Sequence, residues 1–315
     1  MKIVLLESLA IPQERLDSLA APLLAAGHSF QAFERTGDED ALIREGRDAD
    51  VLMLANMPLS GRVIRACERV KLINVAFTGV DHIDLMACRE RGIAVSNAAG
   101  YATRAVAELT VGQMLSLLRS IPAVEARCRQ GGTKDGLVGR ELSGCTVGVI
   151  GTGAIGQAVA RLCGAFGSRV LGCAPRHKPD AEALLTYAPL ETVLQESDIV
   201  TLHCPLTEQT RGMIGARELS MMKPTAYLIN MARGPVVDAA ALAQALKAGT
   251  IAGAAVDVFD REPPLSPDNP LLGAPNCRVT PHVAFATAES MAMRAEIVFR
   301  TLYAWLDGKR MNQVL

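Results

Sequence analysis

The sequence predicts an α/β protein built from two doubly wound parallel-sheet domains, and three observations lead to this fold class. The chain has 315 residues, which is long for one domain and comfortable for two. Half of the residues are hydrophobic but only 4% are aromatic, as suits helices packed on buried parallel strands of Val, Ile and Leu. Short apolar runs alternate with segments of helical periodicity along the whole chain.

The part of the chain before residue 100 is expected to contain five strands that alternate with four helices. The expected strands are Ile3–Leu6, His28–Phe33, Asp50–Ala55, Leu72–Val75 and Ile93–Val95. The expected helices are Ile11–Ala26, Asp38–Glu45, Val63–Cys67 and Ile83–Arg91. Pro12 suits a first helical turn, and Gly27 and Gly92 suit helix ends. This order predicts a complete parallel sheet.

The second part begins with a long helical stretch, Thr103–Arg129, in which Pro122 should produce a kink. The strands expected after it are Val147–Ile150, Val170–Cys173, Ile199–Leu202, Tyr227–Ile229, Ala254–Val256 and Arg278–Thr280. The last helix, Ala286–Leu306, should return to the first domain, because a long helix after the final strand cannot continue that sheet. We therefore expect one domain at 1–98 plus 286–315 and another at 99–285.

A glycine-rich turn lies between the strand Val147–Ile150 and a helical segment. Gly151, Gly153 and Gly156 have the spacing G-x-G-x-x-G. In this context Gly151 permits a tight turn, Gly153 lets a pyrophosphate approach the backbone, and Gly156 lets helix and strand pack closely. The helix N-terminus offers N–H groups and a positive dipole end to phosphates. The motif predicts a dinucleotide site.

Charge and cysteine content exclude several classes of partner. The net charge is −1 without blocks of like charge, so we expect neither nucleic acid nor a membrane surface as partner. The apolar start of the chain is too short for a signal peptide, and no apolar run approaches the ~20 residues of a membrane helix. The eight cysteines are scattered without a C-x-x-C pair, which predicts reduced thiols in a cytoplasmic protein and no metal site.

Three ionisable residues follow three expected strands. Arg233 comes after Tyr227–Ile229, Glu262 after Ala254–Val256, and His282 after Arg278–Thr280. Open α/β sheets bind ligands at the carboxyl ends of their strands, so these side chains should share an edge with the glycine turn. An arginine can clamp a carboxylate, and a histidine oriented by an acid can give a proton to an alkoxide. The set predicts hydride transfer to a small anionic carbonyl compound.

With these residues, the chain resembles the D-isomer-specific 2-hydroxyacid dehydrogenase family over essentially its full length. The signatures that carry the resemblance are Thr78–Asp84, Val106–Glu108, Gly151–Gly156, Leu202–Thr207 with Thr210, Asn230–Gly234, Asp257–Pro263 and Thr280–His282. The resemblance implies a flavodoxin-like substrate domain, a Rossmann cofactor domain, an active site in the cleft between them, and a homodimer.

The resemblance also implies roles for individual residues. His282 would be the acid/base, paired with Glu262, and Arg233 would hold the substrate. The backbone N–H groups of Thr78 and Gly79 would bind the same carboxylate, and Asp257 would accept from the nicotinamide carboxamide. The other expected cofactor contacts are Thr103, Gly151, Gly153, Ala154, Ile155, Gly156, Arg176, His177, Lys178, His203, Cys204, Pro205, Thr210, Met231 and Ala232.

The residue after the second strand of the cofactor domain departs from the pattern of an NAD-binding member. Ala174 stands where an acid would accept from the ribose 2′-hydroxyl, and Arg176, His177 and Lys178 follow it. Cations without an acid favour a 2′-phosphate, so we expect NADP(H) to be preferred and NAD(H) to be possible. The alternative is that Arg176 and Lys178 only decorate a surface turn.

The substrate can be predicted only coarsely. Leu54, Phe77 and Phe285 are the apolar candidates for the pocket wall, and Phe285 would narrow the site. We therefore expect a small 2-keto acid such as glyoxylate or hydroxypyruvate. Thr133 stands where members of the family often have a tryptophan, which weakens inference about the substrate. The alternatives are a phosphoglycerate dehydrogenase or another D-2-hydroxyacid dehydrogenase using NAD, and a cofactor-sensing, corepressor-like binding protein.

Overall fold

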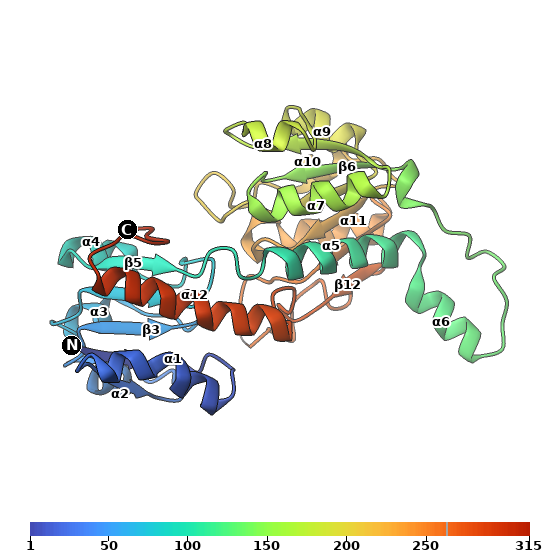
Figure 1. Cartoon of the computed structure of the whole chain (residues 1–315). Helices are drawn as coiled ribbons and strands as arrows, with labels where there is room; N and C mark the ends of the chain where they lie inside the picture. The colour runs from blue at the N-terminus through green and yellow to red at the C-terminus, as the bar shows by residue number, and fades with distance from the viewer. Residues whose placement is uncertain (263) are drawn as a thin grey trace. The chain divides into compact units, whose positions relative to one another are not determined.

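The computed structural model of the chain describes residues 1–262 and 264–315, which form two compact α/β units. The first unit comprises Met1–Ala102 and Ala286–Leu315, and the second comprises Thr103–Phe285. Each unit contains its own sheet, and all strand pairs in both sheets are parallel (Figure 1). Both predicted doubly wound sheets are therefore present.

The first sheet has the strand order β2-β1-β3-β4-β5. Its strands are β1 (Lys2–Leu5), β2 (Ser29–Ala32), β3 (Val51–Leu54), β4 (Leu72–Val75) and β5 (Ala94–Asn97). Every residue of β3 and β4 is buried, which explains why these strands are continuous apolar runs rather than alternating ones. The edge strand β2 is the most exposed strand of this sheet, which fits its polar composition.

The helices of the first unit are α1 (Gln13–Ala25), α2 (Glu39–Gly46), α3 (Gly61–Ala66), α4 (Leu85–Arg91) and α12 (Ala288–Leu306). Four of them begin after residues whose side chains accept backbone hydrogen bonds, and α1 begins after Pro12. Asp38, Ser60, Asp84 and Thr287 cap these four helices in this way. The helix α12 packs on β4, where Asn74 Nδ2 donates to the Val298 carbonyl oxygen at 2.8 Å.

The second sheet has the order β12-β11-β10-β9-β6-β7-β8. Its strands are β6 (Thr146–Ile150), β7 (Arg169–Cys173), β8 (Thr186–Tyr187), β9 (Ile199–Leu202), β10 (Tyr227–Asn230), β11 (Gly253–Val256) and β12 (Cys277–Val279). The strand order reverses between β6 and β9, and this switch point is where such sheets bind ligands. The strand β8 was not predicted, because a strand of two residues is too short to show a periodic pattern in the sequence.

Helices α5 and α6 correct the prediction of one kinked helix over Thr103–Arg129. The chain forms α5 (Thr103–Leu118) and α6 (Ile121–Arg129), with Ser120 between them at a positive φ of 46°. Pro122 lies in the first turn of α6, where its missing N–H would have no helical partner anyway. The proline therefore starts a new helix instead of bending one.

The remaining helices of the second unit are short. They are α7 (Ala154–Ala165), α8 (Pro179–Glu182), α9 (Leu190–Glu196), α10 (Ala216–Met221) and α11 (Ala239–Ala248), with single 3₁₀ turns at Leu142–Gly144 and Gly234–Val236. The core of this unit is built of aliphatic side chains of β6, β9, β10 and β11 and of the helices α9 to α11. This agrees with the low aromatic content of the chain.

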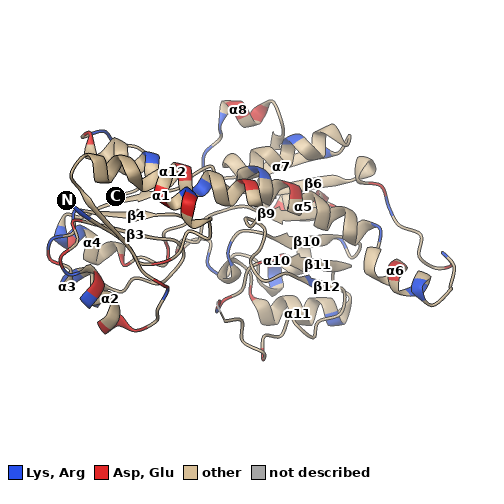
Figure 2. Ribbon diagram, turned by 60° about the horizontal axis from the view of Figure 1, so that its bottom comes forward, with Lys and Arg blue, Asp and Glu red and all other residues tan. Residues whose placement is uncertain are grey.

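Charged side chains of both signs are interspersed within each unit, and Figure 2 shows both on α6, where Arg129 pairs with Glu125 at 2.6 Å. Within residues 1–262 and 264–315, no helix has the length and apolarity to span a bilayer. In the same residues, no group of His, Cys, Asp or Glu side chains is arranged to hold a metal ion. All eight cysteines are free thiols.

Candidate active site

The three glycines of the turn after β6 differ in what surrounds them. A Cβ at Gly151 would lie 2.5 Å from the Cys204 backbone nitrogen, and Gly151 has φ +95°. A Cβ at Gly156 would overlap the Gly151 carbonyl oxygen. At Gly153, by contrast, nothing lies within 4 Å of a Cβ. Gly151 and Gly156 are thus required by close packing within the chain, whereas Gly153 leaves open space beside the backbone.

That open space fits a pyrophosphate. The helix α7 starts directly after Gly153, and no side chain caps its N-terminus. Its first N–H groups and its dipole are therefore available to an anion. Ala154 is exposed and Ile155 half-buried in this first turn. The residues present fit the dinucleotide that the glycine motif predicts.

The loop after β9 lies against the glycine turn and begins with His203 and Cys204. The His203 Nε2 shares a hydrogen bond with the Thr201 hydroxyl at 2.9 Å, and burial lowers the pKa of this imidazole to about 3. Burial raises the pKa of the Cys204 thiol to about 11. Both groups are consequently neutral near pH 7, so this part of the site adds no charge.

Farther along this loop, Pro205 and Thr210 are joined by a local turn. The Thr210 hydroxyl donates to the Pro205 carbonyl oxygen at 2.7 Å and accepts from the Thr207 backbone N–H at 2.8 Å. Pro205 is exposed and Thr210 half-buried. The hydroxyl of Thr210 shapes the loop, and the adenosine contact expected of both residues stays a prediction.

The turn after β7 presents the predicted basic residues. Arg176, His177 and Lys178 are all exposed, and Ala174 is half-buried. Among the described residues, neither Arg176 nor Lys178 forms an ion pair. Their charges are therefore not neutralised by a carboxylate of the same chain.

The loop after β10 carries Arg233 and is folded by the last residue of the strand, Asn230. The Asn230 side chain accepts from the Ala232 backbone N–H at 3.0 Å and donates to the Arg233 carbonyl oxygen at 2.9 Å. Arg233 Nη1 donates to the Ala232 carbonyl oxygen at 2.7 Å. Met231 and Ala232 are buried, so Arg233 is the residue that this loop presents.

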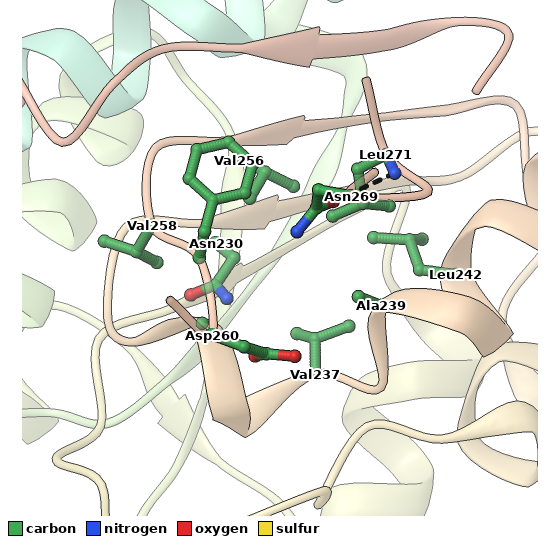
Figure 3. A pocket seen from close by; sticks show the side chains of 11 residues that line it. Asn230, Val237, Ala239, Leu242, Val256, Val258, Asp260, Asn269 and Leu271 are labelled. Carbon is green, nitrogen blue, oxygen red and sulfur yellow. Dashed lines mark hydrogen bonds between the residues drawn. The ribbon is translucent and has the colours of Figure 1, made fainter. Parts of the chain in front are cut away.

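Gly234 brings the loops after β10 and β11 into contact. A Cβ at Gly234 would overlap the backbone of Phe259 and lie 2.5 Å from the Asp260 nitrogen. Behind this contact is a cavity of about 10 Å³, enough for about one water molecule. Figure 3 shows Asn230 and Asp260 beside it, with Asn269 accepting from the Leu271 N–H at 3.0 Å. Asn230 and Gly234 belong to the signature Asn230–Gly234, but their roles in folding this loop were not predicted from the sequence.

His282 and Glu262 form an ion-pair contact. His282 Nδ1 lies 2.7 Å from Glu262 Oε1, and the side chains are 23% and 18% exposed. A carboxylate at Nδ1 fixes the orientation of the ring and the tautomer in which Nε2 exchanges the proton. Pro263, which ends the Asp257–Pro263 signature, lies outside the described residues. Two of the three predicted ionisable residues thus lie in contact, and the acid/base role expected of them stays a prediction.

Asp257 holds the loop that carries His282. Its Oδ1 accepts from the Thr280 hydroxyl at 2.6 Å and from the Val283 N–H at 3.0 Å, and its Oδ2 accepts from the Ala284 N–H at 2.9 Å. The side chain is fully buried, and this burial raises the pKa of its carboxyl group although the three donors oppose the shift. The contact expected between Asp257 and a nicotinamide carboxamide stays a prediction. The sequence did not indicate that Asp257 also anchors the loop around His282.

His282 itself has a strained backbone. Its φ is +52°, in the left-handed region that side chains other than glycine rarely adopt. Its N–H donates to the Asp257 carbonyl oxygen at 2.7 Å and to the Thr280 carbonyl oxygen at 3.0 Å. Asp257 thus holds the strained turn from its backbone and from its side chain. Strain of this kind is typical of functional positions.

The apolar wall predicted for the substrate is only partly present. The Phe285 ring stands edge-on to the His282 ring at 5.5 Å between centroids. In the first unit Leu54 is 0% exposed, so its side chain belongs to the core of that unit and lines no surface. Phe77 is also buried, and its ring lies 6.1 Å from that of Tyr101. Leu54 ends β3, a strand whose four residues are all buried, so the side chain is covered although it stands at the carboxyl end of the strand.

The remaining predicted residues are placed at the ends of elements. Thr78 and Gly79 follow β4 in the first unit, where Asn97 Nδ2 donates to the Thr78 carbonyl oxygen at 2.7 Å. Thr103 is the first residue of α5. Their predicted contacts with substrate and cofactor stay predictions. In the second unit, Arg233, Glu262 and His282 follow the neighbouring strands β10, β11 and β12.

A larger hollow in the second unit is at the other edge of the sheet. It has a volume of about 260 Å³ and lies at the start of β10 and β12, beside Tyr227 and Arg278. The predicted residues follow the opposite ends of these strands. Size alone therefore does not locate the site.

Comparison with known proteins gives a consistent result. The model of the D-isomer specific 2-hydroxyacid dehydrogenase NAD-binding domain matches residues 111–284. A glyoxylate reductase of Thermofilum pendens is 41% identical over 308 residues, covering 95% of this chain and 90% of that protein. A glycerate dehydrogenase of Methylorubrum extorquens is 38% identical over 296 residues, covering 91% and 92%.

A solved structure extends the likeness to the three-dimensional fold. An acyclic imino acid reductase, Bsp5, in complex with NADPH and D-Arg, superposes with a TM-score of 0.91 at 27% identity and full coverage of both chains. Together with the sequence identities and the matched domain, this shows that the chain belongs to the D-isomer-specific 2-hydroxyacid dehydrogenase family and is an NAD(P)-dependent oxidoreductase of that family.

Proposed function

We propose that the protein reduces a small 2-keto acid of the glyoxylate or hydroxypyruvate type to the D-2-hydroxy acid with NADPH. The observation that carries this proposal is the 2.7 Å contact of His282 with Glu262, beside a strand that ends in the Arg233 loop. An oriented imidazole and a guanidinium on one edge of a nucleotide-binding sheet are the groups that reduction of an anionic carbonyl compound requires.

The proposed catalytic roles follow from the chemistry of each side chain. Arg233 binds the substrate carboxylate and polarises the carbonyl group. His282 gives a proton to the carbonyl oxygen as that oxygen becomes a hydroxyl, and Glu262 stabilises the imidazolium beforehand. The nicotinamide cofactor, when bound, supplies the hydride that the carbonyl carbon receives. The proton and the hydride together account for the two hydrogens that the keto acid gains when it becomes the hydroxy acid.

The cofactor preference is supported by the turn after β7. Ala174 offers no carboxylate to a ribose 2′-hydroxyl, and the exposed charges of Arg176 and Lys178 suit a 2′-phosphate. The pyrophosphate would lie over Gly153 at the start of α7. NAD(H) could still bind, because its 2′-hydroxyl meets no repelling group at this turn.

The size of the substrate is supported by Phe285. Its ring is edge-on to His282 at 5.5 Å, so it limits the space beside the imidazole. A two- or three-carbon keto acid needs little room there. A branched or phosphorylated acid would need more room and, in the second case, a further cation.

The test is a panel of keto acids assayed with NADPH and NADH by cofactor absorbance. We expect glyoxylate and hydroxypyruvate to turn over, with at least about a tenfold higher kcat/KM for NADPH. A comparable preference for NADH would contradict the cofactor proposal. Oxidation of 3-phosphoglycerate with NAD, without reduction of small keto acids, would identify a phosphoglycerate dehydrogenase. Tight cofactor binding without turnover of any acid would favour the sensor-like alternative.

A homodimer is a further part of the proposal, and α6 supports it. None of the residues of α6 is buried, and Ile121 and Val124 are 48% and 38% exposed. Figure 1 shows α6 extending away from the sheet of its own unit. A helix that buries none of its residues and exposes apolar side chains in this way is typical of an interface. Light scattering should give twice the monomer mass, and Val124→Glu should shift it towards the monomer. A monomeric wild type would contradict the proposal.

The scattered free thiols support a cytoplasmic location, which fractionation of cells expressing the protein would test.

A further inference from the structure

Tyr187, the last residue of the edge strand β8, contacts two segments of the proposed cofactor site, the glycine turn and the basic turn after β7. No motif in the sequence indicates a role for this residue. Its hydroxyl oxygen is 2.8 Å from the Thr152 hydroxyl, in the glycine turn. The Lys178 backbone N–H donates to the same oxygen at 3.1 Å, from the basic turn after β7. One phenol group therefore joins both segments.

The ring of Tyr187 holds the basic turn by a second contact. His177 stacks on it with the ring centroids 3.9 Å apart and an interplanar angle of 7°. Two successive residues of the turn, His177 and Lys178, are thus fixed by one side chain. The turn is otherwise exposed. The Lys178 carbonyl oxygen, which accepts from the Ala181 N–H at 2.9 Å, connects it to α8, and the stack and the hydrogen bond with Tyr187 connect it to β8.

The other end of the connection is rigid. Thr152 is 2% exposed, between Gly151 and Gly153, and its carbonyl oxygen accepts from Gln157 Nε2 at 3.0 Å. The Gly151 N–H donates to the carbonyl oxygen of Cys173, the last residue of β7, at 2.8 Å. The hydroxyl of Thr152 is therefore held in place, and Tyr187 connects the turn Arg176–Lys178 to it.

We propose that Tyr187 is a positioning residue for cofactor selection: it holds the turn Arg176–Lys178 at a set place relative to the glycine turn. In sheets of this kind the pyrophosphate lies on the glycine turn, and the 2′ substituent of the ribose lies at the end of the next strand. The distance between these two groups is fixed within a nucleotide. A turn held in place recognises a 2′-phosphate with less loss of side-chain and backbone freedom than a mobile one.

This inference rests on the proposed cofactor site, and its test separates the two. The ligands are 2′-phospho-ADP-ribose and ADP-ribose, and calorimetry gives the ratio of their dissociation constants. The ratio for the wild-type protein tests the proposed preference for NADPH. The change of this ratio on substitution of Tyr187 tests the positioning role, whatever the wild-type value.

Tyr187→Phe keeps the ring and removes both hydrogen bonds. We expect affinity for 2′-phospho-ADP-ribose to fall about tenfold and affinity for ADP-ribose to change about twofold at most, as for one or two lost neutral hydrogen bonds. In the assay, KM for NADPH should rise while kcat stays constant. Tyr187→Leu also removes the stack, so it should change the ratio further.

Tyr227→Phe is the matched control, because Tyr227 begins β10 at the other edge of the same sheet. It should leave the ratio unchanged. Thr152→Val should imitate Tyr187→Phe, and Thr152→Ser, which retains the hydroxyl, should not. Equal ratios for Tyr187→Phe, Tyr227→Phe and the wild type would overturn the inference, as would a loss of affinity equal for both ligands.

Discussion

A buried carboxylate holds a loop in each of the two units, and the two carboxylates do it differently. Glu7, after β1, accepts the backbone N–H groups of Ala55 and Met57 at 2.9 Å each. Asp257, after β11, accepts those of Val283 and Ala284 at 3.0 and 2.9 Å. The remaining partner of Glu7 is a cation, Arg35 Nη1, at 2.5 Å, whereas that of Asp257 is the neutral Thr280 hydroxyl.

The charge of the third partner distinguishes the two loops. The guanidinium partly neutralises Glu7, so the first arrangement is a self-contained ion pair that fixes the chain after β3. The hydrogen-bond donors around Asp257 are neutral, and burial raises the pKa of its carboxyl group. It also holds a strained residue, His282, at φ +52°. The same device serves structure in one unit, and in the other it holds His282, the proposed acid/base, in a strained conformation at some cost in stability.

The largest expected effect comes from removing what the second loop presents. His282→Ala should lower kcat by at least about a hundredfold, the usual contribution of general acid catalysis, and leave the fold intact. Arg233→Ala should raise KM as well as lower kcat, because in the proposed role the arginine binds the substrate carboxylate. Steady-state kinetics with glyoxylate measures both. His28→Ala, at the amino end of the chain, is the control and should behave as wild type. Near-normal turnover by His282→Ala would refute the assignment.

The next effect compares the two anchors directly. Asp257→Asn places an amide N–H against a backbone N–H, so we expect the free energy of unfolding to fall by about 2 kcal/mol. Glu7→Gln should destabilise by a similar amount, since it leaves Arg35 without its charge partner. Only Asp257→Asn should also lower kcat beyond the loss of folded protein, because His282 moves. Urea titrations and kinetics on the folded fraction separate these effects. Equal kcat values for both variants would mean that Asp257 is no more than a structural anchor.

These anchors also show where prediction from the sequence ended. Strands such as β3, β4 and β9 were predicted because a buried parallel strand is a continuous apolar run. The positions of Arg233, Glu262 and His282 followed from counting strand ends. The anchoring by Asp257, the bridge by Tyr187 and the burial of Leu54 depend on contacts between residues that are distant in sequence. No local pattern contains that information.

A smaller effect distinguishes the glycines of the second unit. Gly153→Ala meets open space within 4 Å, so the free energy of unfolding should stay within about 0.5 kcal/mol of wild type. Its methyl group would occupy the expected place of the pyrophosphate, and affinity for NADPH should fall about tenfold or more. Gly156→Ala meets the Gly151 carbonyl oxygen and should instead destabilise the fold. Fluorescence titration with NADPH and thermal melting give the two quantities. Unchanged NADPH affinity in Gly153→Ala would place the phosphates elsewhere.

The smallest effect separates two histidines at the same edge of the second sheet. His282 has a carboxylate partner, whereas burial lowers the pKa of His203 to about 3, so its ring stays neutral in the folded protein. In the unfolded chain a histidine binds a proton below about pH 6.5. The unfolded state therefore binds more protons between these two values, and stability is lost as the pH falls through this range.

The expected loss is at most about 1.4 kcal/mol for each pH unit, and less where water reaches the half-buried residue. His203→Gln carries no titrating group, so its free energy of unfolding should fall more gently between pH 6.5 and pH 4 than that of the wild type. Above pH 7 the difference between the two proteins should be constant. Urea unfolding at a series of pH values measures both curves. Parallel curves down to pH 4 would show that His203 accepts a proton in the folded protein, and that this end of the cofactor site can carry a positive charge.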